Sequence, residues 1–145
     1  MDNSPLTALA KTQHTTPVGR KILIVDDDEF MRYAIGYRLR EEGFTVLSAS
    51  DGGQALELLN IKQQHPDLIL LDLMMPYISG IEFLHIIQEK HPLQKSIPVI
   101  IISSLGQNEL KEGGYKLEGY HFIEKPLSLD ELVHWINHFL AYGDN

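Results

Sequence analysis

The chain of 145 residues is 43% hydrophobic and 22% charged, proportions typical of a single globular domain. Its formal net charge of −8 argues against direct binding of nucleic acid, and no apolar run approaches the ~20 residues that a membrane-spanning helix needs. The N-terminal residues lack the basic start and apolar centre of a secretion signal. We therefore expect a cytoplasmic protein with neither nucleic acid nor membrane among its partners.

The N-terminal segment differs from the rest of the chain in composition and in hydrophobic periodicity. Residues 1–19 are polar, rich in Thr and Pro and without a lasting period, which predicts a flexible tail ahead of a folded domain at 20–142. Beyond it, short apolar runs alternate with amphipathic segments. The apolar runs predict strands at 21–25, 44–49, 67–71, 97–102 and 120–124. The amphipathic segments predict helices at 28–42, 53–64, 80–91, 106–116 and 128–141.

Glycines and a serine mark the ends of several predicted helices. The first helix stops before Gly43, a residue type that favours the left-handed turn after a helix. Gly113 and Gly114 fall inside the fourth helix and are expected to loosen it. The last helix begins after Ser128, whose hydroxyl can cap it, and Glu131 can complete a capping box.

The alternation of strands and helices predicts an α/β domain with a parallel sheet and right-handed crossovers. In such a sheet, ligands bind beyond the carboxyl ends of the strands, where the side chains that follow each strand gather. The residues at these positions are mainly carboxylates, hydroxyls and an ammonium. They are Asp26, Asp27 and Asp28 after the first strand, Asp72 after the third, Ser103 and Ser104 after the fourth, and Lys125 and Pro126 after the fifth.

The carboxylates of Asp26, Asp27 and Asp72 would repel one another unless a cation lay between them. Mg²⁺ fits, because it takes oxygen ligands and combines one or two carboxylates with a substrate phosphate. With phosphate at the site, the Lys125 ammonium can pair with one phosphoryl oxygen and the Ser103 hydroxyl can donate to another. Asp72 can then act as the nucleophile and form an aspartyl phosphate. The pattern therefore indicates a phosphoryl-acceptor site.

Each of these residues also has a simpler interpretation. An acidic run ahead of a helix is more often a cap, and we expect Asp28 and Glu29 to act in that way. His134 and His138 have the i, i+4 spacing of metal ligands, but without a third ligand a solvated helix face is the better interpretation. What favours the acceptor site is the combination of suitable groups after four strands of one sheet.

Five segments between about Lys21 and Leu140 carry a further pattern. They are ILIVDDDEFMR, DGGQALELL, PDLILLDLMMPYISGIEFL, PVIIISS and HFIEKPLSLDEL. In this order and spacing they resemble the receiver domain of the two-component response regulators. The resemblance implies a flavodoxin-like three-layer α/β/α sandwich with five parallel strands in the order 2-1-3-4-5. It also implies a signalling protein rather than an enzyme.

The resemblance assigns roles to the residues at the strand ends. Asp72 would accept a phosphoryl group from a histidine kinase or a histidine phosphotransfer protein. Asp26 and Asp27 would bind Mg²⁺ together with Asp72, and Mn²⁺ could substitute for it. The backbone carbonyl of Met74 would be a further metal ligand.

A conformational switch is also implied by the resemblance. Ser103 would be the hydroxyl that moves to the phosphoryl group, and Lys125 the cation that follows it. Phe122 stands at the position of the mobile aromatic, and because it is not a tyrosine its coupling would rest on packing alone. The peptide bond between Lys125 and Pro126 would be cis. The face made by the fourth helix, fifth strand and fifth helix would bind a downstream protein target, in a monomer or a weak phosphorylation-dependent dimer.

Other functions remain open at this stage. A haloacid-dehalogenase-type phosphatase would need a second acid two residues after the nucleophile, where Met74 stands. A flavodoxin would need a loop rich in hydroxyls and glycines after the first strand, where DDDE stands. An adaptor that is never phosphorylated would not need the full set of strand-end groups. Because no output domain follows, we expect a stand-alone receiver, although a segment of a longer protein would have the same features.

Overall fold

A computed structural model of the chain describes residues 19–60, 64–75, 79–90, 97–114, 117 and 119–142. The predicted flexible tail of residues 1–19 therefore lies outside the described residues, apart from Gly19. The predicted domain limits, 20–142, stay a prediction. None of the helices described is long and apolar enough to cross a membrane.

Five parallel strands form one sheet, as the apolar runs predict. They are β1 (Lys21–Val25), β2 (Thr45–Ala49), β3 (Leu68–Asp72), β4 (Val99–Ser103) and β5 (His121–Glu124). Their order, β2-β1-β3-β4-β5, is the predicted one. Every residue of the central strand β3 is buried, because helices cover both of its faces.

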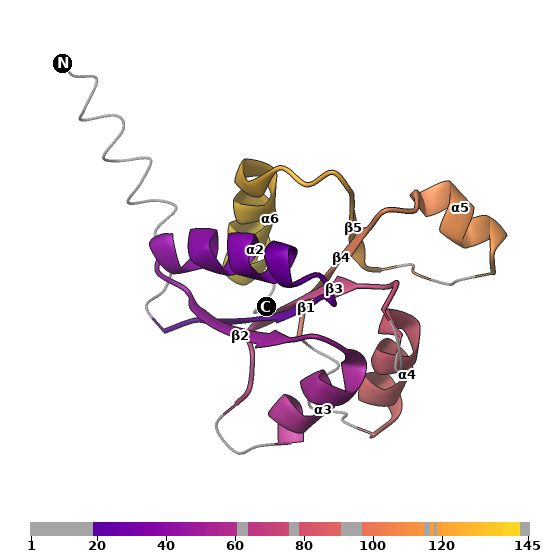
Figure 1. Ribbon diagram of the computed structural model, residues 1–145, viewed down its shortest axis with the longest axis horizontal. Coiled ribbons are helices and arrows are strands. Elements are labelled where there is room, and N and C mark those ends of the chain that lie inside the picture. The colour runs from indigo at the N-terminus through magenta and orange to yellow at the C-terminus, as the bar shows by residue number, and fades with distance from the viewer. Residues whose placement is uncertain are drawn as a thin grey trace.

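Helices lie on both faces of the sheet and make the predicted three-layer sandwich (Figure 1). They are α2 (Glu29–Glu41), α3 (Gly52–Asn60), α4 (Gly80–Lys90), α5 (Gln107–Glu112) and α6 (Leu129–Tyr142). The sheet separates two apolar clusters. One joins it to α2 and α6, and the other joins it to α3, α4 and α5. The alternation of side chains along each strand supplies both clusters.

Capping residues end several of the helices close to the positions that the sequence predicts. The Asp28 carboxylate accepts from the second and third amides after it, which starts α2, and Gly43 follows the helix at φ +97°. At α6, the Ser128 hydroxyl accepts from the Glu131 amide at 3.2 Å. The predicted capping role of Asp28 is therefore confirmed.

Two predicted helices are too long. α5 ends at Glu112 instead of 116, because Gly113 forms its C-cap and Gly114 adopts φ +89°. Residues 115 and 116 lie outside the described residues. α3 is described only to Asn60, and Gln64, the predicted last residue, is not helical.

Gly80 brings the start of α4 against the end of β3. Its amide donates to the Leu73 carbonyl at 3.1 Å. A Cβ at this position would lie 2.5 Å from the Asp72 carbonyl oxygen and 2.6 Å from the Leu73 Cα. Only a residue without a side chain can make this approach without displacing the backbone of Asp72.

Candidate functional site

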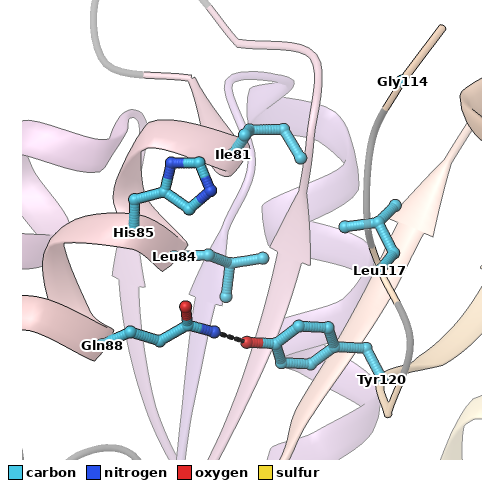
Figure 2. A pocket seen from close by; sticks show the side chains of 7 residues that line it. All are labelled: Ile81, Leu84, His85, Gln88, Gly114, Leu117 and Tyr120. Carbon is cyan, nitrogen blue, oxygen red and sulfur yellow. Dashed lines mark hydrogen bonds between the residues drawn. The ribbon is translucent and has the colours of Figure 1, made fainter.

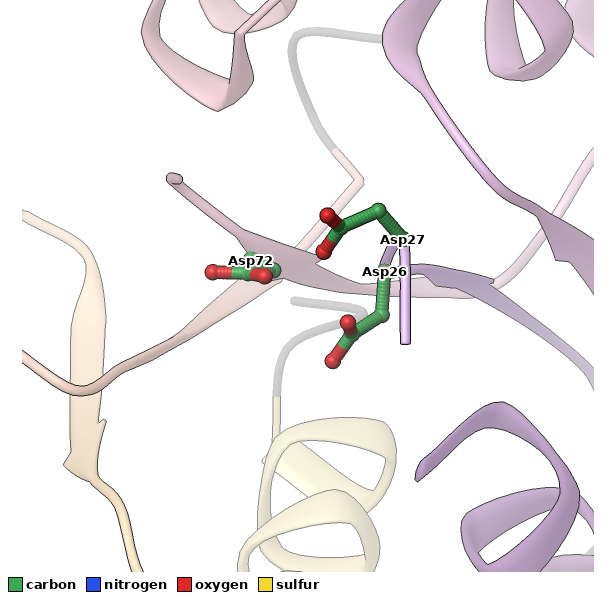
Figure 3. A group of neighbouring side chains, drawn as sticks. All are labelled: Asp26, Asp27 and Asp72. Atoms are coloured by element: carbon green, nitrogen blue, oxygen red, sulfur yellow. The ribbon is translucent and has the colours of Figure 1, made fainter. Parts of the chain in front are cut away.

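Three carboxylates meet at the carboxyl edge of the sheet. Asp72 is the last residue of β3, and Asp26 and Asp27 follow the adjacent strand β1. One oxygen from each carboxylate lies within 4.8 Å of the others, and Figure 3 shows the three groups directed toward a common space. Asp26 and Asp72 are only 3% and 5% exposed, whereas Asp27 is open to solvent. The structure thus brings together the three predicted metal ligands.

Asp26 has a partner at each of its polar atoms. Its amide donates to the Ala49 carbonyl at 3.1 Å, and its carbonyl accepts from the Arg32 guanidinium at 2.7 Å. One carboxylate oxygen accepts from the Asp28 amide at 2.9 Å. The other lies 3.5 Å from the Lys125 ammonium nitrogen. Buried carboxylates need such partners, because leaving one unpaired costs several kcal/mol.

Lys125 connects β5 to the acidic cluster. Its Nζ lies 3.8 Å from Asp72 Oδ2, and its amide donates to the Ser103 carbonyl at 2.8 Å. The peptide bond to Pro126 is cis, as predicted. Ser103 is fully buried, and its Oγ accepts from the Leu105 amide at 3.0 Å, so the hydroxyl proton remains available to another acceptor.

The Asp72 carboxyl is electrostatically unusual. Its pKa is raised from the ordinary 3.8 to about 6, chiefly because burial disfavours the charged form. The charges of Asp26 and Asp27 also raise the pKa. The Met74 amide, which donates to Asp72 Oδ1 at 3.1 Å, lowers it, as does the Lys125 ammonium. A cation close to this position would stabilise the charged form of the Asp72 carboxylate.

The donor set fits Mg²⁺. The cluster offers only carboxylate oxygens, two of them from buried side chains, and hard divalent cations prefer such ligands. Among the described residues this is the only group of three or more candidate ligands. The role of the Met74 carbonyl as a further ligand stays a prediction. His134 and His138 are exposed on α6, each edge-on to Trp135.

Phe122, the predicted mobile aromatic, lies in the middle of β5. It is half-buried against the apolar cluster that also contains Leu110 of α5 and Tyr120. It pairs in register with Ile101 of β4, two residues before Ser103. Its contacts are therefore with the apolar layer beneath α5, and its predicted switching role stays a prediction.

Two pockets border the α4 side of the sheet. One, of about 370 Å³, adjoins the acidic cluster and is lined by Asp27, Leu73, Met74, Met75, Ser79, Ile81 and Leu110. The other, of about 220 Å³, is drawn in Figure 2. It lies between α4 and the segment before β5, and the Gln88 amide donates to the Tyr120 hydroxyl across it. That contact joins α4 to a residue two positions before Phe122.

The predicted site set omitted Arg32 and Gly80. Arg32 lies in the DDDEFMR segment, but nothing in the spacing shows that its guanidinium folds back onto the Asp26 carbonyl. Gly80 follows Asp72 at the start of a predicted helix, and glycine at a helix start was the available signal.

Comparison with known proteins decides the family. The family model of the response regulator receiver domain matches residues 22–137. The chain belongs to the response regulator receiver family. The response regulator RR06 of Streptococcus pneumoniae is 41% identical over 112 residues, which are 77% of this chain and 49% of that protein. The phosphate regulon transcriptional regulatory protein PhoB of Escherichia coli is 36% identical over 117 residues, 80% of this chain and 49% of that protein. This receiver thus spans about half the length of these relatives.

Solved receiver structures agree with the fold. The receiver domain of the Francisella response regulator 1452 superposes with a TM-score of 0.72 at 35% identity, covering 85% of this chain and 98% of that one. The chemotaxis protein CheY4 of Vibrio cholerae superposes with a TM-score of 0.73 at 25% identity, covering 83% of this chain and 98% of that one. The fold and family implied by the sequence resemblance are confirmed.

Proposed function

We propose that this receiver is a phosphoacceptor in a two-component phosphorelay, with Asp72 as the residue that is phosphorylated. The observation that carries the proposal is the placement of one buried carboxylate, Asp72, close to two other acids and with its Oδ2 3.8 Å from the Lys125 ammonium nitrogen. Such an arrangement concentrates both a nucleophile and the charges that a phosphoryl group requires. The donor would be a phosphohistidine of a kinase or phosphotransfer protein, and such a relay implies the cytoplasm.

The chemistry follows from the site's own groups. An ionised Asp72 oxygen forms a bond to phosphorus while the bond from phosphorus to the donor imidazole nitrogen breaks, and that nitrogen keeps the electron pair. Lys125 stabilises negative charge on the phosphoryl oxygens, and the Ser103 hydroxyl can donate to one of them. Asp26 and Asp27 would hold Mg²⁺, which when bound supplies positive charge to the transferring phosphoryl group.

The alternatives fit less well. A phosphatase of the haloacid-dehalogenase type would need an acid at position 74, where Met74 places an exposed thioether. A receiver-like adaptor that is never phosphorylated would not require a Lys125 ammonium beside a buried Asp72 carboxylate. Signalling without turnover of small substrates is therefore the function that this arrangement supports best.

Acetyl phosphate provides the direct test. Incubation of the protein with acetyl phosphate and Mg²⁺ is expected to add one phosphoryl group, seen by intact-mass spectrometry, because the small donor needs only the acceptor site. The gain should be absent in Asp72→Asn and after removal of Mg²⁺ by chelation. Phosphoryl gain that persists in Asp72→Asn would refute the assignment, and steady hydrolysis of small phosphate esters would favour a phosphatase instead.

An exposed aromatic stripe beside the site offers a docking surface for a protein donor. Phe30, Tyr33 and Tyr37 lie on one face of α2 and are 75%, 69% and 58% exposed. The rings of Tyr33 and Tyr37 stack with centroids 6.4 Å apart. Large exposed aromatics in a contiguous stripe are typical of interaction surfaces. Phe30 is three residues from Asp27, so a protein bound here would lie next to the acceptor.

The double variant Phe30→Ser, Tyr33→Ser should separate donor docking from chemistry. Transfer from a phosphorylated histidine phosphotransfer protein is expected to slow at least about tenfold, because apolar contacts are lost. Phosphorylation by acetyl phosphate should keep its wild-type rate. Tyr37→Ser, further along the helix from the site, should have a smaller effect. Equal slowing with both donors would show that the stripe supports the fold rather than the donor.

The downstream partner is proposed to bind the face formed by α5, β5 and α6. On this face the His121 ring lies 4.1 Å from the Trp135 ring and 5.4 Å from that of Phe139, measured between centroids. Burial lowers the pKa of His121, and the charge of His138 lowers it further, whereas that of Glu131 raises it. The half-buried aromatic cluster gives this face an apolar element suited to partner binding.

A further inference from the structure

Arg32 is bonded twice to the turn that carries the acidic residues. Its guanidinium Nη1 donates to the Asp26 carbonyl at 2.7 Å, a short charge-assisted hydrogen bond. Its amide donates to the Asp28 carbonyl at 3.0 Å. The amide bond is the regular helical one that any residue at this position makes, whereas the guanidinium bond ties the first turn of α2 to the main chain of Asp26. A long, flexible side chain is used here to hold main-chain atoms.

Asp27 depends on this turn for its position. Its carboxylate is exposed, yet one of its oxygens lies within 4.8 Å of oxygens from Asp26 and Asp72. Asp26 and Asp72 are buried and held at the ends of neighbouring strands. The conformation of the backbone between Asp26 and Asp28 therefore decides whether the third carboxylate reaches the other two.

We propose that Arg32 is a positioning residue for the metal, holding the turn from Asp26 to Asp28 so that the Asp26 and Asp27 oxygens converge with those of Asp72. The inference rests on the proposed function, in which these acids bind Mg²⁺. Hydrogen bonds that hold metal-binding residues commonly set the affinity for the metal in this way, because they orient those residues before the ion binds.

The charge of Arg32 and its hydrogen bond predict opposite effects on the affinity for the metal when Arg32 is replaced, so the positioning role can be tested. A guanidinium close to a cation site repels the ion, so removing its charge would tighten metal binding if charge were all that mattered. Removing the hydrogen bond would loosen the turn and weaken binding. Arg32→Lys keeps the charge and loses the planar donor group, while Arg32→Gln loses the charge as well.

The test measures Mn²⁺ binding to unphosphorylated protein by electron paramagnetic resonance. Both Arg32→Lys and Arg32→Gln are expected to raise the dissociation constant about tenfold. Arg40→Gln removes an exposed cation from the same helix and should leave the constant unchanged or slightly lower. Thermal unfolding identifies any variant that fails to fold, and the lysine variant, as the more conservative change, then decides the result.

The Mg²⁺ dependence of the phosphorylation rate distinguishes a positioning role of Arg32 from a general loss of activity. With acetyl phosphate as donor, the Mg²⁺ concentration for half-maximal rate should rise about tenfold in Arg32→Lys, while the rate at saturating Mg²⁺ stays close to wild type. Unchanged or tighter Mn²⁺ binding in both Arg32 variants would overturn the proposal, as would a low rate at saturating Mg²⁺. Wild-type protein that binds no Mn²⁺ or Mg²⁺ would overturn the proposed function as well.

Discussion

Replacing Gly80 with alanine is expected to lower the free energy of unfolding by about 3 kcal/mol and to disrupt the acceptor site. The new Cβ would lie 2.5 Å from the Asp72 carbonyl oxygen and 2.6 Å from the Leu73 Cα, both of them backbone atoms. Side chains can rotate away from such a clash, but the backbone of β3 is paired to β1 and β4 on its two sides. Either α4 must move outward or the end of β3 must shift.

Gly36→Ala is the matched control for this experiment. Gly36 lies within α2, and a Cβ there would meet the Arg40 Nη1 at 3.2 Å and the Val46 Cγ1 at 3.7 Å. The end of an arginine moves easily, and alanine is favoured over glycine in a helix by ~1 kcal/mol. Urea unfolding should therefore show little change or a gain for Gly36→Ala. Equal stability of Gly80→Ala and wild type would contradict the packing of α4 on β3.

Asp72→Asn is expected to stabilise the metal-free protein by up to about 3 kcal/mol at pH 7.5. The pKa of Asp72 is raised from 3.8 to about 6, chiefly by burial, so the charged form is disfavoured in the folded state. The two values differ by roughly two, and each pKa unit corresponds to ~1.36 kcal/mol. Asparagine removes the charge and can still accept the Met74 amide through its side-chain oxygen.

The pH dependence of this gain has a definite sign. Because the folded pKa lies above the unfolded one, the favourable contribution of protonated Asp72 is fully present below pH 3.8 and is lost as the pH rises through about 6. The stability difference between Asp72→Asn and wild type should thus be close to zero at pH 3.8 and reach its plateau above about pH 7. Urea unfolding across this range measures it.

Mg²⁺ and a surface variant serve as controls. Added Mg²⁺ should stabilise wild type more than Asp72→Asn, because the variant lacks one of the three carboxylates. Glu89→Gln removes an exposed carboxylate near the end of α4 and should change stability by less than about 0.5 kcal/mol at any pH. A loss of stability in metal-free Asp72→Asn at pH 7.5 would show that Asp72 is better compensated than its burial suggests.

The sheet could be predicted closely from sequence because three of its strands, β1, β3 and β4, are short and almost continuously apolar. Short runs of this kind are typical of buried parallel strands. The topology of the sheet then places the residues that follow them at its carboxyl edge. That is why Asp26, Asp72 and Lys125 could be grouped before their distances were known. The helices were less predictable, since the glycines after Glu112 stop α5 sooner than its amphipathic pattern suggests.

Contacts that depend on side-chain direction could not be predicted. The return of the Arg32 guanidinium to the Asp26 carbonyl depends on rotamers, and spacing along the sequence carries no sign of it. The bond between Gln88 and Tyr120 joins residues 32 positions apart and depends on how α4 lies beside the segment that precedes β5. Gly80 could be noticed as a glycine, but its clash with β3 is visible only once the two elements are in contact.

The acidic cluster and its lysine come from β1, β3 and β5, with Ser103 at the end of the strand between the last two. The site therefore forms only when nearly the whole sheet is paired, and a partly folded chain would lack it. A metal that binds only this native arrangement would shift the folding equilibrium as a whole, by ~1.4 kcal/mol for each tenfold excess over its dissociation constant. Resistance of the chain to proteolysis should then rise with the metal concentration, because the ions proposed to assist phosphorylation of Asp72 would also reduce the unfolded fraction.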